Sequence, residues 1–312
     1  MWNIELYGMD LFFVVYSFFI LSFAGWIYES TKCSLAKKMF VNRGFLNGPI
    51  IPVYGMGGTL VYLLLRPFSG HVAAVFLLGF ILTTLLEYTT AVLMEQAFHA
   101  KWWDYSRFKY NYQGRVCLPA SLLWAVFSVA DVYVLGPYVQ KLVERIPRRF
   151  GEWAGYVLVV ITLVDFAVTV VYTLQLSNTM ERLNELREEL LTYLLSTSLI
   201  EKTGEVKEAL YSTTIGKLSE KRDSAMNILT TRFKAGLSRD LNEEEKERKV
   251  TMFKHELEGK FKHFITKYKS NMRKHNFIHK RLLKAFPTLT FTKGRYYLLE
   301  LKERINFYND RK

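Results

Sequence analysis

Two glutamates stand where a membrane-spanning helix would ordinarily be apolar throughout. Glu87 follows the uncharged run 72–86, and Glu95 comes eight positions later. Because each residue turns a helix by about 100°, the two carboxylates occupy neighbouring faces, about 80° apart. An acidic side chain at the centre of a spanning helix costs about 2.5–3.5 kcal/mol, so such residues usually face the interior of a helix bundle. These acids therefore need partners or a ligand inside the protein.

Other charges lie at the ends of neighbouring apolar segments. Arg43 precedes the second segment and Arg115 the fourth, whereas Glu29 ends the first. Asp104 stands in an aromatic loop, beside two tryptophans. The candidate set, for binding a substrate or for holding the structure, is Glu29, Arg43, Glu87, Glu95, Asp104 and Arg115.

Two interpretations of this set are open. In one, the carboxylates pair with the arginines and only hold the helices together. In the other, they line a cavity open to the cytoplasm and bind a polar substrate, an ion or a proton. Asp131 and Asp165 also interrupt apolar segments, but the sequence offers neither of them an evident basic partner.

Five apolar segments must position these charges, each long enough for a bilayer that needs about 20 helical residues. They cover residues 11–28, 44–65, 72–94, 116–140 and 153–180. The charge is partitioned: residues 1–177 hold 13 Lys+Arg and 10 Asp+Glu, and residues 178–312 hold 29 and 19. The sequence predicts an all-α protein, with a five-helix membrane domain over 1–177 and a basic helical cytoplasmic domain over 178–312.

Basic residues in the loops predict the orientation in the cell membrane. The loops after the first and third apolar segments are rich in lysine and arginine, and residues 1–10 contain neither. This pattern favours an outside N-terminus and a cytoplasmic tail in a multi-pass protein. The loop 141–149 disagrees, because its four basic residues would face outward. The absence of a basic stretch before residue 11 argues against a cleaved signal peptide.

The stretch 42–58, NRGFLNGPIIPVYGMGG, opens the second segment with five glycines and two prolines. Its glycines favour close helix packing in lipid or, alternatively, unwound backbone that lines a cavity. They match neither the dinucleotide fingerprint nor the P-loop.

The tail is expected to be helical and partly coiled coil. Leu176, Met180, Leu183, Leu190 and Leu194 approximate a heptad seam, which Arg187 interrupts. A second helix over 249–284 is basic with one apolar face, which either packs on this stalk or lies on anionic headgroups. His275 and His279 stand one turn apart, where solvated surface histidines are more expected than a metal pair.

No catalytic, nucleotide-binding or metal motif is recognisable, so neither enzyme activity nor a cofactor is expected. Cys33 and Cys117 fit two reduced thiols. An enzyme acting on lipid headgroups remains an alternative, with Glu87 or Glu95 as base and an arginine holding the phosphate. A non-catalytic scaffold that recruits partners through the tail is another.

Five motifs resemble the bacterial ABC-transporter type IV family, also called CmpB-like permeases. They are GWIYE (25–29), NRGFLNGPIIPVYG (42–55), LLEYTTAVLME (85–95), WWDYS (102–106) and GRVCL (114–118). The resemblance covers roughly residues 10–175. It implies a permease-like component that moves a small polar solute or ion, and it carries the six candidate charges but no catalytic residue.

The chain lacks a Walker A lysine loop, so a permease would need a separate ATPase subunit, docked on loops 30–43 or 96–115. Membrane lipids are the other expected partners, a homo-oligomer is left open, and nucleic acid is not expected because no recognised motif accompanies the basic charge.

Overall fold

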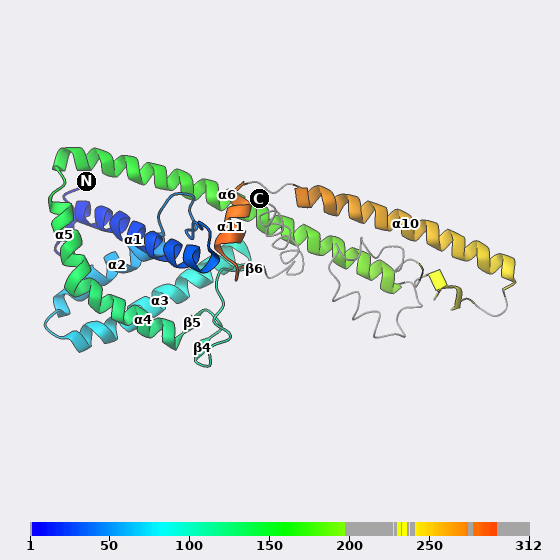
Figure 1. Ribbon diagram of the computed structural model, residues 1–312, viewed down its shortest axis with the longest axis horizontal. Coiled ribbons are helices and arrows are strands. Elements are labelled where there is room, and N and C mark those ends of the chain that lie inside the picture. The colour runs from blue at the N-terminus through cyan, green and yellow to red at the C-terminus, as the bar shows by residue number, and fades with distance from the viewer. Residues whose placement is uncertain are drawn as a thin grey trace. The chain divides into compact units, whose positions relative to one another are not determined.

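The structure is a computed structural model that describes residues 2–196, 227, 230–231, 233–235, 237, 241–273 and 277–291. The described chain is mostly helical, and its strands have only two residues each. It divides into two compact units. The first comprises Met1–Gln175 with Phe277–Thr290, and the second comprises Leu176–Asn276 with Phe291–Lys312. The segment Phe277–Thr290 therefore packs with residues that precede it by more than a hundred positions (Figure 1).

The first unit is a bundle of antiparallel helices. Its helices are α1 (Leu11–Lys37), α2 (Pro52–Leu65), α3 (Val72–Phe98), α4 (Leu118–Ala130), α5 (Gly136–Glu144), the first part of α6 (Arg148–Ser196) and α11 (Phe277–Ala285). A 3-10 turn, η1 (Arg66–Phe68), precedes α3, and a π-helical turn, η2 (Asp131–Leu135), joins α4 to α5.

Short strands punctuate the bundle. Antiparallel hairpins are formed by β1 (Glu5–Leu6) with β2 (Met9–Asp10) and by β4 (Asn111–Tyr112) with β5 (Val116–Cys117). The strands β3 (Ala100–Lys101) and β6 (Thr290–Phe291) are the other two. Asp10 ends β2 and caps α1 by accepting a hydrogen bond from the backbone N–H of Phe13 at 2.8 Å.

Four helices are long and apolar enough to cross a membrane, among the residues that the structure describes. They are Leu11–Lys37, Val72–Phe98, Leu118–Glu144 and Arg148–Leu186. On the outer face of α3, Leu77, Ile81 and Leu85 are each about 60% exposed, as lipid-facing side chains are. The prediction of a helical membrane protein is thus confirmed. The count of five spans is not, because the segment expected over 44–65 becomes helical only at Pro52 and spans 14 residues as α2.

The glycine-rich stretch is non-helical in its first part and closely packed in its second. Residues 38–51 lie outside any helix, as unwound backbone would. The glycines beyond them bring α2 close to α1: a Cβ on Gly55 would lie 2.0 Å from Ser22 Oγ and 2.3 Å from the Phe18 carbonyl oxygen. Only glycine allows this contact between the two helices.

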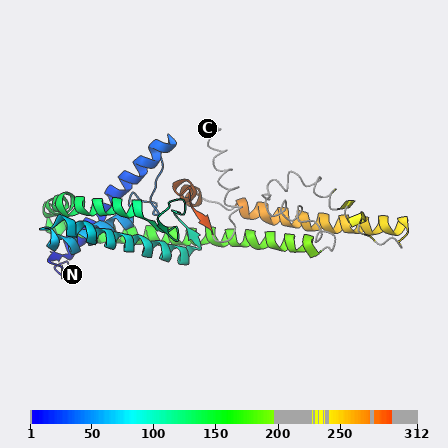
Figure 2. The ribbon, with the colours of Figure 1, turned by 90° about the horizontal axis from the view of Figure 1, so that it is seen from below.

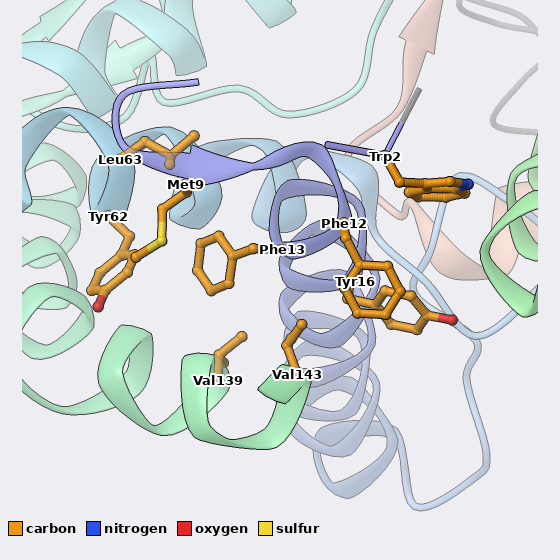
Figure 3. Close-up of a cluster of buried hydrophobic side chains, with 9 residues drawn as sticks. All are labelled: Trp2, Met9, Phe12, Phe13, Tyr16, Tyr62, Leu63, Val139 and Val143. Carbon is orange, nitrogen blue, oxygen red and sulfur yellow. The ribbon is translucent and has the colours of Figure 1, made fainter. Parts of the chain in front are cut away.

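One end of the bundle is closed by an apolar cluster (Figure 3). Its buried members are Trp2, Met9, Phe12, Phe13, Tyr16, Tyr62, Leu63, Val139 and Val143. Arg148 fixes the N-terminal hairpin to this end, because Nη1 lies 2.5 Å from Asp10 Oδ2 and Nη2 donates to the Trp2 carbonyl. Arg148 is one of the four basic residues in the loop 141–149, which would face outward in the expected orientation. Its charge is therefore held in an ion pair.

In the second unit, the end of α6 and the helix α10 (Glu243–Arg273) lie side by side (Figures 1 and 2). Leu176, Met180 and Leu183 on α6 are fully buried. On α10 the apolar face expected from the sequence is buried at Phe253, Leu257 and Phe264, which favours packing over a position on headgroups. A coiled coil stays a prediction, because Leu190 and Leu194 lie among residues whose side chains are not described.

Candidate polar site at one end of the bundle

The unwound segment before α2 is held by Asp165, near the middle of the apolar part of α6. Its carboxylate accepts hydrogen bonds from the backbone N–H of Asn47 at 3.1 Å and of Gly48 at 2.8 Å. It also accepts one from the side-chain amide of Asn47, at 2.8 Å. Non-helical backbone at membrane depth is tolerated only where the protein satisfies its polar groups. The sequence offered Asp165 no basic partner, and its partners are backbone and amide N–H groups instead.

The same segment folds around Asn42. Its Oδ1 accepts from Trp26 Nε1 at 2.8 Å and from the backbone N–H of Gly44, and its Nδ2 donates to the Asn47 carbonyl. The segment is therefore a built turn, tied to α1 on one side and to α6 on the other.

Arg281 on α11 closes the carbonyl side of this turn. Its guanidinium donates to the carbonyls of Gly44 and Phe45, at 2.7 and 2.6 Å, and to Asn47 Oδ1 at 3.1 Å. Burial lowers the pKa of Arg281 to about 10, and the negative charge of Asp165 opposes that shift. The side chain thus remains protonated at neutral pH. A segment from the end of the chain completes the polar network of the membrane unit.

Further contacts fix α11 in place. His279 is buried and its Nε2 lies 2.8 Å from the Tyr172 carbonyl oxygen, so Nε2 carries the proton. The expectation of a solvated surface histidine was wrong for His279, and His275 lies outside the described residues. The described residues contain no group of three metal-binding side chains. Cys33 and Cys117 are free thiols, as expected.

Beyond α11, Phe286 stands between Trp102 and Arg43. Its ring lies edge-on to the Trp102 indole, with the two ring centres 4.8 Å apart, and Arg43 Cζ lies 4.3 Å from the centre of the Phe286 ring. The Thr288 hydroxyl donates to the Trp102 carbonyl. This stacking orients Arg43 toward the bundle.

Glu29 and Arg43, two of the candidate charges, lie close to each other. Glu29, on α1, accepts a hydrogen bond from the Tyr54 hydroxyl at 2.8 Å, and its second oxygen lies 3.9 Å from Arg43 Nε. Arg43 Nη1 is buried and has no hydrogen-bond partner among the described residues. The pair is therefore only loosely joined and leaves one donor of Arg43 unused.

Glu87, on α3, is linked to this pair through aromatic side chains, since the Trp124 ring lies 5.2 Å from that of Tyr54. It accepts a hydrogen bond from the Tyr105 hydroxyl at 3.1 Å, and the Trp124 indole lies near the same carboxylate. Burial and the charge of Glu87 raise the pKa of Tyr105, with a smaller contribution from Glu29, so this phenol remains protonated and faces both carboxylates. Glu87 Oε2 is buried without a hydrogen-bond partner in the part of the chain that the structure describes.

Glu95 and Arg115 form a separate and complete pair. Arg115 Nε and Nη2 donate to one oxygen of Glu95, at 3.0 and 2.6 Å, and the guanidinium also lies 5.6 Å from the Tyr88 ring centre. These hydrogen bonds raise the pKa of Arg115. Arg115 thus serves Glu95 and not Glu87.

Asp104 lies apart from the other candidates, in the loop before β4. Its carboxylate accepts from the backbone N–H and the hydroxyl of Ser106, and these hydrogen bonds lower its pKa. Gly114 passes so close that a Cβ there would lie 2.6 Å from Asp104 Oδ1, and its φ of +71° also favours glycine. Asp104 shapes this turn.

The site therefore brings together Glu29, Arg43 and Glu87, with phenols that the sequence analysis missed. Tyr54 and Tyr105 looked like parts of an apolar helix and an aromatic interfacial belt. Their one sequence signal was a hydroxyl at the level of the acidic residues. Arg281 gave no such signal, because it follows the turn it closes by 234 positions.

Comparison with known protein families gives one match. Residues 16–170 match the family model described as "Putative ABC-transporter type IV". Searches of curated proteins and of solved structures found no match. The matched range contains all six candidate charges and Asp165, and it ends before α11.

Proposed function

Residues 16–170 form a domain of the Putative ABC-transporter type IV family, and from this premise we propose that the chain is the membrane component of a transporter for a small polar solute. The site formed by Glu29, Arg43, Glu87, Tyr54 and Tyr105 binds that solute. We propose the bacterial cell membrane as its location, with the site at the cytoplasmic end of the bundle.

The observation that carries the proposal is a pair of unused polar atoms. Arg43 Nη1 is a buried donor without a hydrogen-bond partner among the described residues, and Glu87 Oε2 is a buried acceptor that has only the Trp124 indole near it there. A buried polar group left unpaired costs about 1–3 kcal/mol. A solute that offers an acceptor to Arg43 and a donor to Glu87 would remove both costs. Small solutes with an acidic group and an amine or hydroxyl have this chemistry.

The unwound segment 38–51 supports a transport role. Transporter sites are commonly formed where membrane helices are interrupted and their backbone is exposed to a cavity. Here a short helix of 14 residues, α2, follows the interruption. We propose that together they complete a fifth crossing, which would put the N-terminus and the end of α6 on opposite sides of the membrane. The basic loops after the first and third apolar segments favour the outside for the N-terminus and the cytoplasm for the end of α6.

An apolar cavity of about 590 Å³ supports the expected contact with lipid. It lies between α1, α2 and α6, with Val14, Phe18, Leu60 and Leu163 among its lining residues. Lipid acyl chains match this lining, and they would cover the side of the bundle remote from the charges.

Energy would come from a separate ATPase subunit. The two loops expected to receive it expose large apolar side chains: Leu35 and Phe40 are about three-quarters exposed, and Tyr110 is 63% exposed. Exposed apolar groups of this kind in loops and at helix ends are typical of contact surfaces for other proteins.

Cross-linking in native membranes tests this proposal. Photoreactive amino acids at positions 40 and 110 should cross-link an ATPase subunit, whereas one at position 153, exposed at the other end, should not. Purified together, the two proteins should hydrolyse ATP, and Phe40→Asp should lower the yield of the complex. If positions 40 and 110 capture only lipid, or only proteins without a nucleotide-binding domain, the transporter proposal is wrong.

A further inference from the structure

Asp131 is a buried carboxylate at the junction of α4 and η2 that the site above does not use. It is 4% exposed, and neither of its side-chain oxygens has a hydrogen-bond partner in the described residues. The helical stretch Leu118–Glu144 has 27 residues, and Asp131 is the central one. The neighbouring helices end at this level, because the adjacent Val132 packs with Leu65, the last residue of α2, and with Val75, in the first turn of α3. Asp131 is therefore buried among apolar side chains, where an ionised carboxylate is costly.

The helices packed against Asp131 offer it no cation. Within the described residues, α2 and α4 contain no Asp, Glu, Lys, Arg or His. On α5 the nearest charges are Lys141 and Glu144, ten and thirteen residues further, which is about 15 and 20 Å along the axis. The Tyr62 hydroxyl, on α2, is already donated to Gln140.

The remaining charged and titratable groups lie on η1, α3 and α1. Arg66 of η1 lies 5.9 Å from the Tyr62 ring centre and donates to Met9 Sδ. His71, the N-cap of α3, is about five residues of helix from the level of Asp131, or about 7.5 Å.

Gly79 of α3 packs against Ser128, three residues before Asp131. Because α3 runs antiparallel to α4, Glu87 lies about eleven residues of helix from Asp131, or about 16 Å. On α1, Tyr16 donates to the Gly151 carbonyl, and Glu29 and Lys32 are at the far end. The neighbours on one side form an apolar cluster of Val61, Leu65, Val75 and Val132.

The backbone at Asp131 is unusual as well. Asp131–Leu135 is a π-helical turn inside an otherwise α-helical stretch, and such turns often occur at functional sites. Gly136 follows it, and a Cβ there would lie 2.0 Å from the Tyr62 ring. Asp131 itself continues the buried face of α4 that contains Ser121, Ala125 and Ser128, at helical spacing.

We propose that Asp131 is a proton-binding site buried between α2 and η2, and that the structure shows its protonated form. A neutral carboxyl without a partner costs far less in apolar surroundings than an ionised one. A metal cation is disfavoured, because it needs several oxygen ligands and the adjoining cluster is apolar. Loss of the proton would place a charge between α2 and η2 and drive their separation, so proton release and a change in helix packing are coupled.

Infrared spectroscopy of the full chain in lipid tests this proposal. The carbonyl stretching band of a protonated carboxyl should be present at neutral pH in the wild type and in Asp104→Asn, an exposed control, and lost or reduced in Asp131→Asn. The wild-type band should weaken at alkaline pH. Thermal unfolding gives a second readout: Asp131→Asn should match the wild type at acidic pH and exceed it at alkaline pH.

A difference spectrum between wild type and Asp131→Asn that shows only an ionised carboxylate at neutral pH would overturn the proposal. Equal loss of stability with rising pH in both proteins would overturn the coupling. If the asparagine variant does not fold, the wild-type band and its pH dependence, compared with those of Asp104→Asn and Glu87→Gln, still decide whether a protonated carboxyl other than Asp104 and Glu87 exists. These outcomes do not depend on the ATPase or on any solute.

Discussion

Asp165 accepts hydrogen bonds from both the backbone N–H and the side-chain amide of Asn47, 118 positions earlier, at 3.1 and 2.8 Å. This contact decides how the second apolar segment is built. The acid in α6 replaces the helical hydrogen bonds that residues 44–51 would otherwise make, so the chain can turn inside the bundle before α2 begins at Pro52. The turn then presents Arg43 to the polar site.

We expect Asp165→Ala to destabilise the membrane unit. The substitution leaves the N–H groups of Asn47 and Gly48 without an acceptor, and each unpaired buried group costs about 1–3 kcal/mol. Asp165→Asn keeps one acceptor oxygen, so its stability should lie between those of the wild type and Asp165→Ala. Thermal unfolding in detergent measures both, with Asp104→Ala as the control because its carboxylate is exposed. An Asp165→Ala protein as stable as this control would contradict the anchoring role.

Arg281→Lys should loosen the turn although it keeps the charge. A lysine ammonium cannot reproduce the planar set of donors that reaches Gly44, Phe45 and Asn47. Hydrogen exchange of residues 44–48 should become faster, while exchange in α3 stays unchanged. The matched control is Lys280→Ala, which removes the exposed neighbour of Arg281. Equal exchange in the two variants would show that α11 does not hold the turn.

Docking of α11 should weaken in mild acid. Burial lowers the pKa of His279 below its ordinary value of 6.5, and the hydrogen bond to Tyr172 only partly opposes this. Well above pH 6.5 the histidine is neutral in both the docked and the free segment, so its titration does not change the stability of docking. Below it the free segment takes up a proton more readily than the docked one, so docking loses stability as pH falls.

Hydrogen exchange of residues 277–291, corrected for the intrinsic pH dependence of exchange, measures this loss. His279→Gln can still donate to the Tyr172 carbonyl but cannot be protonated, so its protection should be constant over the same range. A glutamine variant that loses protection in parallel with the wild type would assign the effect to another group.

Double-mutant cycles should distinguish a pair with a structural role, Glu95 with Arg115, from two residues that we propose to bind the solute, Glu87 and Arg43. Glu95 and Arg115 share two hydrogen bonds and are about four-fifths buried, so Glu95→Gln and Arg115→Gln should show a coupling of about 1 kcal/mol in unfolding. Glu87→Gln and Arg43→Gln should show none, because these side chains have no direct contact. Coupling of the same size for both pairs would mean that Glu87 and Arg43 are structural too.

The sequence predicted most of the bundle and part of the site. Hydropathy placed α1, α3 and the first part of α6 close to where they lie, and charges at helix ends pointed to Glu29 with Arg43 and to Glu95 with Arg115. Periodicity could not show that residues 44–51 are unwound, because an apolar run has the same hydropathy whether or not it is helical.

The parts of the site that the sequence did not predict depend on contacts between residues far apart in the chain. Asp165 appeared to lack a partner only because backbone N–H groups carry no sequence signature, and Asn47 lies 118 positions earlier. Arg281 belongs to a basic stretch of the tail, where one arginine cannot be told from its neighbours. Whether the acids bind a solute was left open for the same reason: the unused atoms of Arg43 and Glu87 exist only in three dimensions.

The most direct test of the account is a ligand screen by thermal unfolding. Small solutes that combine an acidic group with an amine or hydroxyl are added to the wild type, Glu87→Gln, Arg43→Gln and Glu152→Gln, the last altering an acid at the other end of the bundle. A ligand at 100 times its Kd stabilises a protein by about 2.7 kcal/mol. We predict that at least one such solute stabilises the wild type and Glu152→Gln but neither of the site variants. Stabilisation of all four proteins alike, or of none by any solute of this class, would contradict the account.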